Sequence, residues 1–259
     1  MQADMDELVH VRFTRKMVDL LMEIDEAMYK PCVTDKRGER VMYVELLKAL
    51  YGTLRAARLF WEKLSTKLKE WGFIMNRYDP CVANKIIDGT QMTVAWHVDD
   101  LKVSHKKLSA IREFAALLND EFGKETPISE SYGKKHEYLG MQMDYGVPGE
   151  VSISMEDYIR LVLQEAPEDM GGTAATPASA CLFRVNPSNT NKLTGAKKDA
   201  FVHVVMQLLY LSQRARPDIH TAISFLCGRL HHPDTNDYKK VARVVKYLRG
   251  TADLPLSFL

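Results

Sequence analysis

Residues 91–104 have the sequence QMTVAWHVDDLKVS, and this stretch decides the fold. Apolar residues alternate with others along its first half, which is the pattern of a half-buried strand. Asp99 and Asp100 interrupt the alternation before an apolar pattern resumes. A second apolar run, residues 82–87, precedes it across the connection Asp88-Gly89-Thr90, which is typical of a hairpin. The stretch therefore predicts an antiparallel sheet with two carboxylates at a tight turn.

Helical patterns lie on both sides of this sheet. From Leu47 to Trp71, apolar residues recur at alternating steps of three and four, which predicts a long amphipathic helix. Near the N-terminus, residues 8–28 are expected to be extended or helical, and Asp35–Gly38 to form a turn. The patterns after the sheet predict, in order, a helix over Leu108–Phe122, a strand over residues 139–145, a return strand over residues 151–154 and another helix from Met155.

The C-terminal half changes in character after residue 166. Residues 167–196 are rich in Pro, Gly, Ala, Ser, Thr and Asn, which predicts a linker. All patterns after the linker are helical, and Arg216-Pro217-Asp218 is expected to start one helix with a local ion pair. The three predicted helices are Phe201–Arg214, Ile219–Leu230 and Tyr238–Arg249.

Composition excludes several classes of protein. The 259 residues are 46% hydrophobic and 27% charged, which excludes intrinsic disorder and collagen-like chains. No apolar run reaches the roughly 18 residues of a membrane span, so no membrane partner is expected. The start MQADMDELVH has no apolar run, and no signal peptide is expected. The four cysteines form no CxxC pair, which favours a reducing intracellular compartment.

The formal net charge of +1 conceals an uneven distribution. Residues 48–70 carry a net charge of +4, and residues 197–249 carry +6. Two basic regions in a nearly neutral chain favour a polyanionic partner. Solvated basic helix faces are the alternative explanation.

Asp99 and Asp100 are the first candidate functional residues. Two adjacent acids at the end of an apolar strand repel each other, and a cation relieves the repulsion. Mg²⁺ prefers such hard oxygen ligands and leaves coordination sites for substrate phosphates. The alternative is an acidic β-turn, because Asp is a common turn residue.

Five segments, in the same order along the chain, resemble copia-type retrotransposon reverse transcriptases. AWHVDDLKVS resembles the strand–turn–strand motif aromatic-x-Asp-Asp of that family, and LLKALYGTLRAARLFWEKL resembles its LxKALYGLKQAPRAWxxKL segment. HEYLGMQM, SISMEDYIRLVL and the stretch from LLYLSQRARPDI to KYLRGT resemble its later blocks. The resemblance covers nearly the whole chain.

The resemblance implies an α+β right-hand polymerase. Residues 1–166 are then partial fingers and palm, 167–196 a linker, 197–253 an all-helical thumb or connection, and 254–259 the start of an RNase H domain. The implied activity is RNA-directed DNA synthesis, with Mg²⁺ or Mn²⁺, deoxynucleoside triphosphates and a primed RNA or DNA template. The implied location is a cytoplasmic particle or the nucleus, and a homo-oligomer is compatible with the family.

The resemblance also assigns site residues. Asp99 and Asp100 match the catalytic, metal-binding aspartates, whereas Gly52, Arg55 and Arg58 match the nucleotide side. His97 stands where the family has an aromatic residue and is assigned to the primer end, and Arg55 replaces a Gln whose position lets an arginine contact phosphate. The predicted last helix carries five cations for template–primer phosphates, namely Lys239, Lys240, Arg243, Lys246 and Arg249.

One departure from the family concerns the third palm aspartate. Met1 aligns after it, and Asp4 and Asp6 match acids of another motif, so the chain is expected to be a truncated copy with impaired synthesis. Two alternatives stay open: a non-catalytic nucleic-acid-binding remnant, and an unrelated metal-dependent phosphotransferase or nuclease. Primer extension separates the first two.

Overall fold

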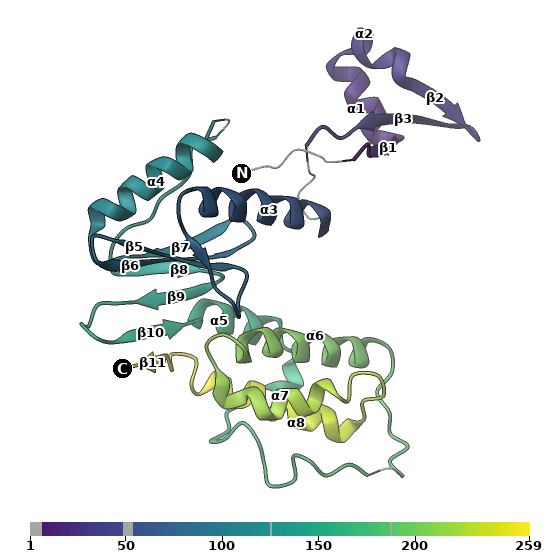
Figure 1. The fold of residues 1–259 in the computed structure, drawn as a ribbon. Helices are drawn as coiled ribbons and strands as arrows, with labels where there is room; N and C mark the ends of the chain where they lie inside the picture. Colours follow the sequence, from purple (N-terminus) through teal and green to yellow (C-terminus); the bar gives the residue numbers. More distant parts are fainter. Residues whose placement is uncertain (1–6, 49–53, 125, 187) are drawn as a thin grey trace. The chain divides into compact units, whose positions relative to one another are not determined.

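The computed structural model of the protein describes residues 7–48, 54–124, 126–186 and 188–259. The chain forms two compact units, Met1–Glu130 and Ser131–Leu259, here called the first and second unit. Each unit contains antiparallel strands, helices and a hydrophobic core of its own (Figure 1). The predicted mixture of helices and antiparallel sheets is confirmed, whereas its division into palm, fingers and thumb stays a prediction.

The first unit begins with a small sheet in the order β1-β3-β2. Its hairpin turn lies at Arg37 and Gly38, which have φ angles of 53° and 78°. Positive φ at both central residues is the requirement of a type I′ turn, so the turn predicted over residues 35–38 is confirmed. The elements are β1 (His10–Thr14), α1 (Lys16–Ile24), α2 (Glu26–Tyr29), β2 (Val33–Lys36) and β3 (Glu39–Glu45).

A larger sheet in the order β4-β5-β6-β7 follows. The predicted hairpin is confirmed, because β5 and β6 pair in antiparallel register from Val82↔Ala95 to Ile87↔Thr90. The elements of this sheet and its helices are α3 (Leu54–Glu70), β4 (Ile74–Met75), β5 (Val82–Ile87), β6 (Thr90–His97), β7 (Asp100–Ser104) and α4 (Leu108–Phe122).

One face of this sheet is covered by α3 and α4 (Figure 1). The buried residues of β6 are Met92, Val94 and Trp96, at the spacing of two that the alternation predicts. From α3, Phe60, Leu64 and Leu68 belong to the same core at steps of four. The α4 residues of this core are Ala110, Phe114, Leu118 and Phe122. Because Met92, Val94 and Trp96 face this core, the alternate residues of β6 are directed to the opposite, open face.

The prediction for the α3 region is confirmed over its described part. The helix extends from Leu54 to Glu70, and Gly72 follows it with a φ of 83°. Residues 49–53, which include Gly52 and the predicted approach to this helix, lie outside the described residues.

In the second unit the sheet order is β11-β10-β9-β8. The strand predicted over residues 139–145 is confirmed over Met141–Asp144, but its predicted start is wrong, because Leu139 and Gly140 form a turn with φ angles of 53° and 74° between two strands. The Tyr210 hydroxyl donates to the Leu139 carbonyl oxygen at 3.0 Å and so holds this turn. The strands are β8 (Lys135–Tyr138), β9 (Met141–Asp144), β10 (Val151–Ser154) and β11 (Leu256–Phe258).

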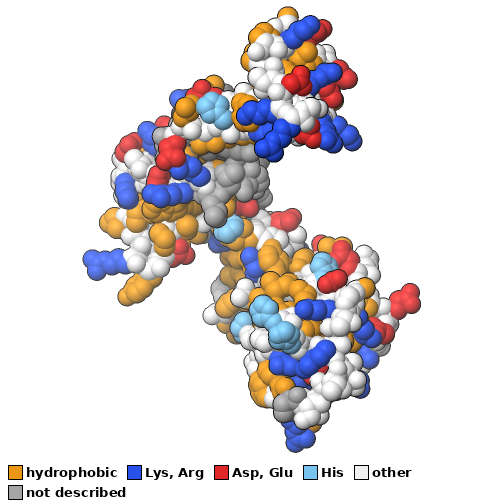
Figure 2. Space-filling view, turned by 90° about the vertical axis from the view of Figure 1, so that its right-hand side faces the viewer, with side chains coloured by type: hydrophobic (Ala, Val, Ile, Leu, Met, Phe, Trp, Pro, Cys, Tyr) orange, Lys and Arg blue, Asp and Glu red, His pale blue; other side chains and the backbone are white. Residues whose placement is uncertain are grey.

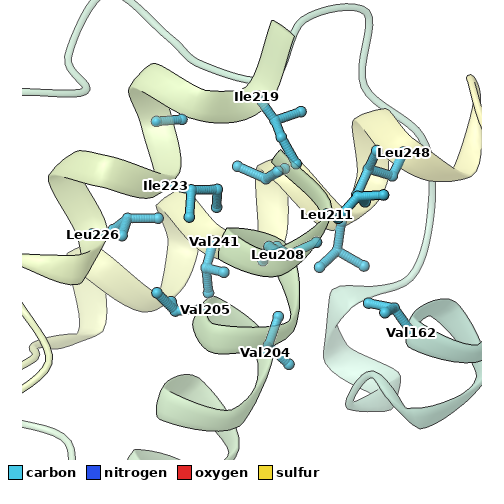
Figure 3. Close-up of a cluster of buried hydrophobic side chains, with 14 of the residues drawn as sticks. Val162, Val204, Val205, Leu208, Leu211, Ile219, Ile223, Leu226, Val241 and Leu248 are labelled. Carbon is cyan, nitrogen blue, oxygen red and sulfur yellow. The ribbon is translucent and has the colours of Figure 1, made fainter. Parts of the chain in front are cut away.

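The helices of the second unit enclose its core. Val204, Val205, Leu208 and Leu211 of one helix meet Ile223 and other apolar side chains of its neighbours, as Figure 3 shows. The three predicted C-terminal helices are confirmed, with bounds shifted by a few residues. The helices are α5 (Glu156–Glu165), α6 (Gly195–Ser212), α7 (His220–Cys227) and α8 (Thr235–Arg249), with short 3-10 turns at Glu168–Met170 and Pro217–Ile219.

Along the sequence, the boundary between the two compact units lies between Glu130 and Ser131 rather than at residue 166. The reason lies in the packing, since Ile153, Ile159 and Val162 belong to the core of the C-terminal helices. The predicted polymerase subdomains are therefore a different division from the compact units. Residues 256–258, expected to begin another domain, pair with β10 in this structure. None of the described helices has the length and apolarity needed to cross a bilayer.

Candidate functional site

The acidic pair lies at the tip of the hairpin between β6 and β7. His97 pairs with Asp100 across the two strands, which leaves Val98 and Asp99 as a two-residue turn. Val98 has a φ of 55°, whereas Asp99 is not in the positive-φ region. Positive φ at the first central residue alone is the pattern of a type II′ turn, in which glycine is preferred. A β-branched residue there is strained, with a cost of about 1–3 kcal/mol.

Both carboxylates are open to solvent. Asp99 and Asp100 are exposed, and neither side chain makes a hydrogen bond or an ion pair with another described residue. Lys102, two residues further along β7, is half-buried and pairs with Ala95. Two adjacent acids without a partner cation repel each other, and a divalent ion offsets that repulsion.

The donor set fits a hard divalent cation. Carboxylate oxygens are the ligands that Mg²⁺ prefers, and one or two of them suffice when substrate phosphates complete the coordination. Within the described part of the chain, no group of three or more His, Cys, Asp or Glu side chains is arranged to hold a metal ion. Asp99 and Asp100 are thus a pair rather than a closed site, and Asp4 and Asp6 lie outside the described residues.

His97 lies next to this pair. It is the last residue of β6, its side chain is exposed, and its cross-strand partner is Asp100. Directly opposed residues of an antiparallel pair have side chains on the same face of the sheet. The structure therefore places His97 and Asp100 on the same open face. This position is compatible with the predicted role of His97 beside the acidic pair.

The predicted nucleotide-side cations lie near the start of α3. Arg55 forms an ion pair with Glu7 at 2.8 Å, and Arg58 forms one with Glu62 at 2.8 Å. The Arg58 side chain is 78% exposed, so its ion pair is a surface contact of little energetic weight. A triphosphate can replace such a carboxylate as the partner of the guanidinium.

The five cations of α8 divide into two groups. Lys240, Arg243 and Arg249 donate hydrogen bonds to main-chain carbonyls of residues 170–184. The side chains of Lys239 and Lys246 make no hydrogen bond or ion pair with another described residue, and they line hollows of the surface. Three of the five predicted phosphate ligands therefore have a structural partner within the chain, which the sequence pattern did not indicate.

One face of the surface agrees with this division. On the face in Figure 2, Lys and Arg side chains stand in separate groups among uncharged and acidic ones. A continuous basic face is the usual electrostatic footprint of a nucleic-acid-binding surface. Any phosphate contacts of the described side chains on that face are therefore local.

The prediction for Arg216-Pro217-Asp218 is confirmed. The Arg216 guanidinium is 2% exposed and donates from Nε to Asp218 Oδ1 at 3.0 Å and from Nη2 to Oδ2 at 2.8 Å. It also donates to the carbonyl oxygen and the hydroxyl of Thr251. Burial raises the pKa of Asp218, but hydrogen bonds from Arg216 and Tyr247 outweigh burial and hold that pKa below its ordinary value. This cluster connects the start of α7 to the end of α8.

The geometry defines a class of protein first. A mixed α/β chain with an open acidic pair at the tip of an edge hairpin is a candidate metal-dependent enzyme of phosphoryl chemistry. A family model described as reverse transcriptase (RNA-dependent DNA polymerase) matches residues 6–180. The chain belongs to this family, as a copia-type retrotransposon reverse transcriptase region.

Individual relatives agree with the family. A retrovirus-related Pol polyprotein from transposon TNT 1-94 of Nicotiana tabacum is 24% identical over 91% of this chain, which spans 18% of that polyprotein. A putative transposon Ty5-1 protein of Saccharomyces cerevisiae is 24% identical over 91% of this chain and 74% of its own length. The Pol polyprotein from transposon RE2 of Arabidopsis thaliana is 25% identical over 86% of this chain and 15% of its own length. No solved structure matches the chain.

Proposed function

We propose that this chain performs RNA-directed DNA synthesis as the reverse transcriptase region of a retrotransposon polyprotein. The observation that carries the proposal is the open acidic pair, Asp99 and Asp100, at the tip of the hairpin between β6 and β7. The elements up to α5 correspond to fingers and palm in this proposal, and α6 to α8 to the thumb or connection.

Asp99 and Asp100 hold Mg²⁺ or Mn²⁺ beside the end of the primer in this proposal. When bound, such ions activate the attacking 3′ oxygen and stabilise the leaving phosphate oxygen. The strained turn at Val98 fixes where the two carboxylates stand. His97 lies on the open face with Asp100 and contacts the primer end.

Basic residues position the remaining substrates. Arg55 and Arg58 contact the triphosphate of the incoming deoxynucleotide. Gly52, which lies outside the described residues, is assigned to the same side by the family resemblance. The α8 cations contact phosphates of the primed RNA or DNA template, and Lys239 and Lys246 are the two whose side chains make no hydrogen bond or ion pair with another described residue. Phosphate contacts position a duplex and carry no sequence preference.

Synthesis by this chain alone is proposed to be slow. The described residues supply two carboxylates to the metal site and no third ligand of their own. A two-carboxylate site depends more heavily on substrate phosphates to complete the coordination. Impaired stabilisation of the transition state is the expected consequence.

Primer extension on a homopolymer RNA template, with Mg²⁺ or Mn²⁺, tests the proposal. D99N and D100N are expected to lower the extension rate by about 100-fold or more, as loss of a main electrostatic group does. The matched control is D88N, which changes another acid at a hairpin turn, one that forms an ion pair with Lys107. Extension by D99N at the rate of the unchanged protein, or equal losses with D88N, would contradict the proposal.

A non-catalytic nucleic-acid-binding role is the second candidate. The observation that favours it is the absence of a third metal-ligating side chain at the acidic pair among the described residues. Binding of a primed template without any extension, with the affinity unchanged or improved in D99N, would identify this role.

A further inference from the structure

The second unit contains a hollow beside α8. It lies between α8 and residues 170–186, here called the strap, and has a volume of about 410 Å³. Ligand pockets usually measure about 300–1,000 Å³. No acidic residue is among the described residues that line it. The polar residues of its wall are Thr173, Ser179, Lys239, Lys240, Arg243 and Lys246.

The wall of this hollow is fixed by hydrogen bonds along the strap. Arg249 Nη1 donates to the carbonyl oxygens of Met170 at 3.0 Å and Gly172 at 2.9 Å. Arg243 donates from Nε and Nη2 to the carbonyl and the hydroxyl of Thr176 at 3.1 and 2.9 Å. The predicted linker is thus attached to α8 over most of its first half, and the hollow is a preformed feature of the unit.

The next attachment closes the far end of the hollow. Lys240 Nζ donates to the Arg184 carbonyl oxygen at 2.9 Å and lies 3.5 Å from Asp237 Oδ1. Its side chain is 13% exposed, so its charge is largely committed to the protein. Lys240 is therefore a wall residue rather than a ligand-binding one.

The side chains of Lys239 and Lys246 differ from that of Lys240 in this respect. They lie seven residues apart on α8, which is about two turns or 10.5 Å along the helix axis. Arg243 lies between them on the same face of the helix. Neither ammonium group makes a hydrogen bond or an ion pair with another described residue, although the main-chain carbonyl of Lys246 accepts from the Ala174 N–H at 3.2 Å. Three cations in a row, two of them uncompensated, repel each other until an anion joins them.

A second hollow of about 350 Å³ is also lined by Lys239 and Lys246. Its one acidic lining residue, Asp169, is already bonded, because it accepts from the Tyr238 hydroxyl at 2.7 Å and from Lys197 Nζ at 3.3 Å. The hydrogen bond from Tyr238 is the main cause that lowers the pKa of Asp169, which keeps it ionised and committed to these partners. The two lysines thus line both hollows, and the described lining residues include no acid without another partner.

We propose that Lys239, Arg243 and Lys246, together with the strap, form a binding site for a compact polyphosphate anion. A short chain of phosphates carries several charges within the length of the row, and the hydroxyls of Thr173 and Ser179 add neutral donors. The proposed function assigns the same α8 cations to template phosphates. The phosphates of a nucleic-acid backbone are the competing occupant, and the experiment distinguishes the two.

Titration calorimetry of the full chain with inorganic tripolyphosphate tests the proposal. One tripolyphosphate per chain is the expected stoichiometry. The double variant K239Q/K246Q is expected to bind tripolyphosphate with an affinity that is lower by about tenfold or more. The control, K106Q/K135Q, removes the same total charge at two exposed lysines that belong neither to α8 nor to the strap. Circular dichroism of each variant checks that the helices are retained.

Three outcomes overturn the proposal. The first is the absence of saturable tripolyphosphate binding, and the second is equal weakening in both double variants, which would show a general charge effect. The third is a single-stranded oligonucleotide that binds through the same lysines and cannot be displaced by excess tripolyphosphate, which would assign the row to nucleic acid. The comparison of D99N with D88N in primer extension tests the acidic pair and does not involve these lysines, so the two proposals fail separately.

Discussion

Replacing Arg216 with methionine is expected to destabilise the second unit by about 3 kcal/mol. The substitution keeps an apolar side chain at a position where Arg216 is 2% exposed, but it removes the cationic partner of Asp218, which keeps only the side-chain hydrogen bond from Tyr247, and two donors to Thr251. Removing one partner of a buried ion pair costs about 3–5 kcal/mol, because the other charge stays buried. The Asp218 side chain is 33% exposed, which favours the lower end. The same loss corresponds to a decrease of about 12 °C in Tm for a unit of this size.

The assay uses a difference between the two units. All three tryptophans, Trp61, Trp71 and Trp96, belong to the first unit, so tryptophan fluorescence reports its unfolding in urea. Far-UV circular dichroism reports the helices of both units. R216M is expected to shift the dichroism transition and to leave the fluorescence transition where it is. The two probes therefore locate the loss within the chain.

The control for this prediction is R229M. Arg229 is also paired with a buried acid, Asp237, at 3.1 Å, but Lys240 stays beside that acid when Arg229 is removed. We expect R229M to cost about 1 kcal/mol, the usual net value of one hydrogen bond. Equal losses in R216M and R229M, or a loss below that value in R216M, would refute the account of the Arg216 cluster.

Three further predictions concern single side chains. V98G relieves the positive φ at the acidic turn and is expected to stabilise the first unit by about 1 kcal/mol, measured by tryptophan fluorescence in urea; a loss would show that the turn is unstrained. D234A removes the cap whose carboxylate accepts from the Asn236 and Asp237 main-chain N–H groups, and is expected to cost about 1–2 kcal/mol by circular dichroism, against no change in a mid-surface control such as K106Q. The pKa of Asp218 is lower in the folded state than its ordinary value of 3.8, so the ionised carboxylate stabilises the fold above pH 3.8 and this stabilisation is lost as the pH falls through the folded pKa. D218N is expected to remove this part of the pH dependence of unfolding, measured by circular dichroism in acid. An unchanged acid profile in D218N would exclude the contribution of Asp218.

Much of the fold follows from local pattern. The alternation around Trp96 predicts both the strand and its buried face, because a half-buried strand has only one arrangement that hides its apolar residues. The stripe that includes Leu64 and Leu68 predicts α3 for the same reason. The acidic turn is predictable as well, since Asp99 and Asp100 are the point at which the apolar pattern stops.

The turn at Leu139 and Gly140 shows where local pattern fails. The alternation over residues 139–145 satisfies a single strand, and Leu is not a typical turn residue. The turn is held instead by the hydroxyl of Tyr210, which lies 71 residues away in sequence. A contact at that separation leaves no trace in the pattern of the turn itself. Gly140, with its positive φ, is the one local signal that a turn was available there.

The basic helix α8 shows a related limit for the site. A row of cations on a helix indicates that something electronegative lies opposite, and both phosphates and main-chain carbonyls satisfy that condition. Arg243 and Arg249 have carbonyls as partners because the neighbouring strap is irregular and leaves its C=O groups unpaired. Lys239 and Lys246 have none among the described residues, although they belong to the same sequence pattern. Charge spacing therefore identifies the face, and only the path of the strap decides which of its cations are left to bind an anion.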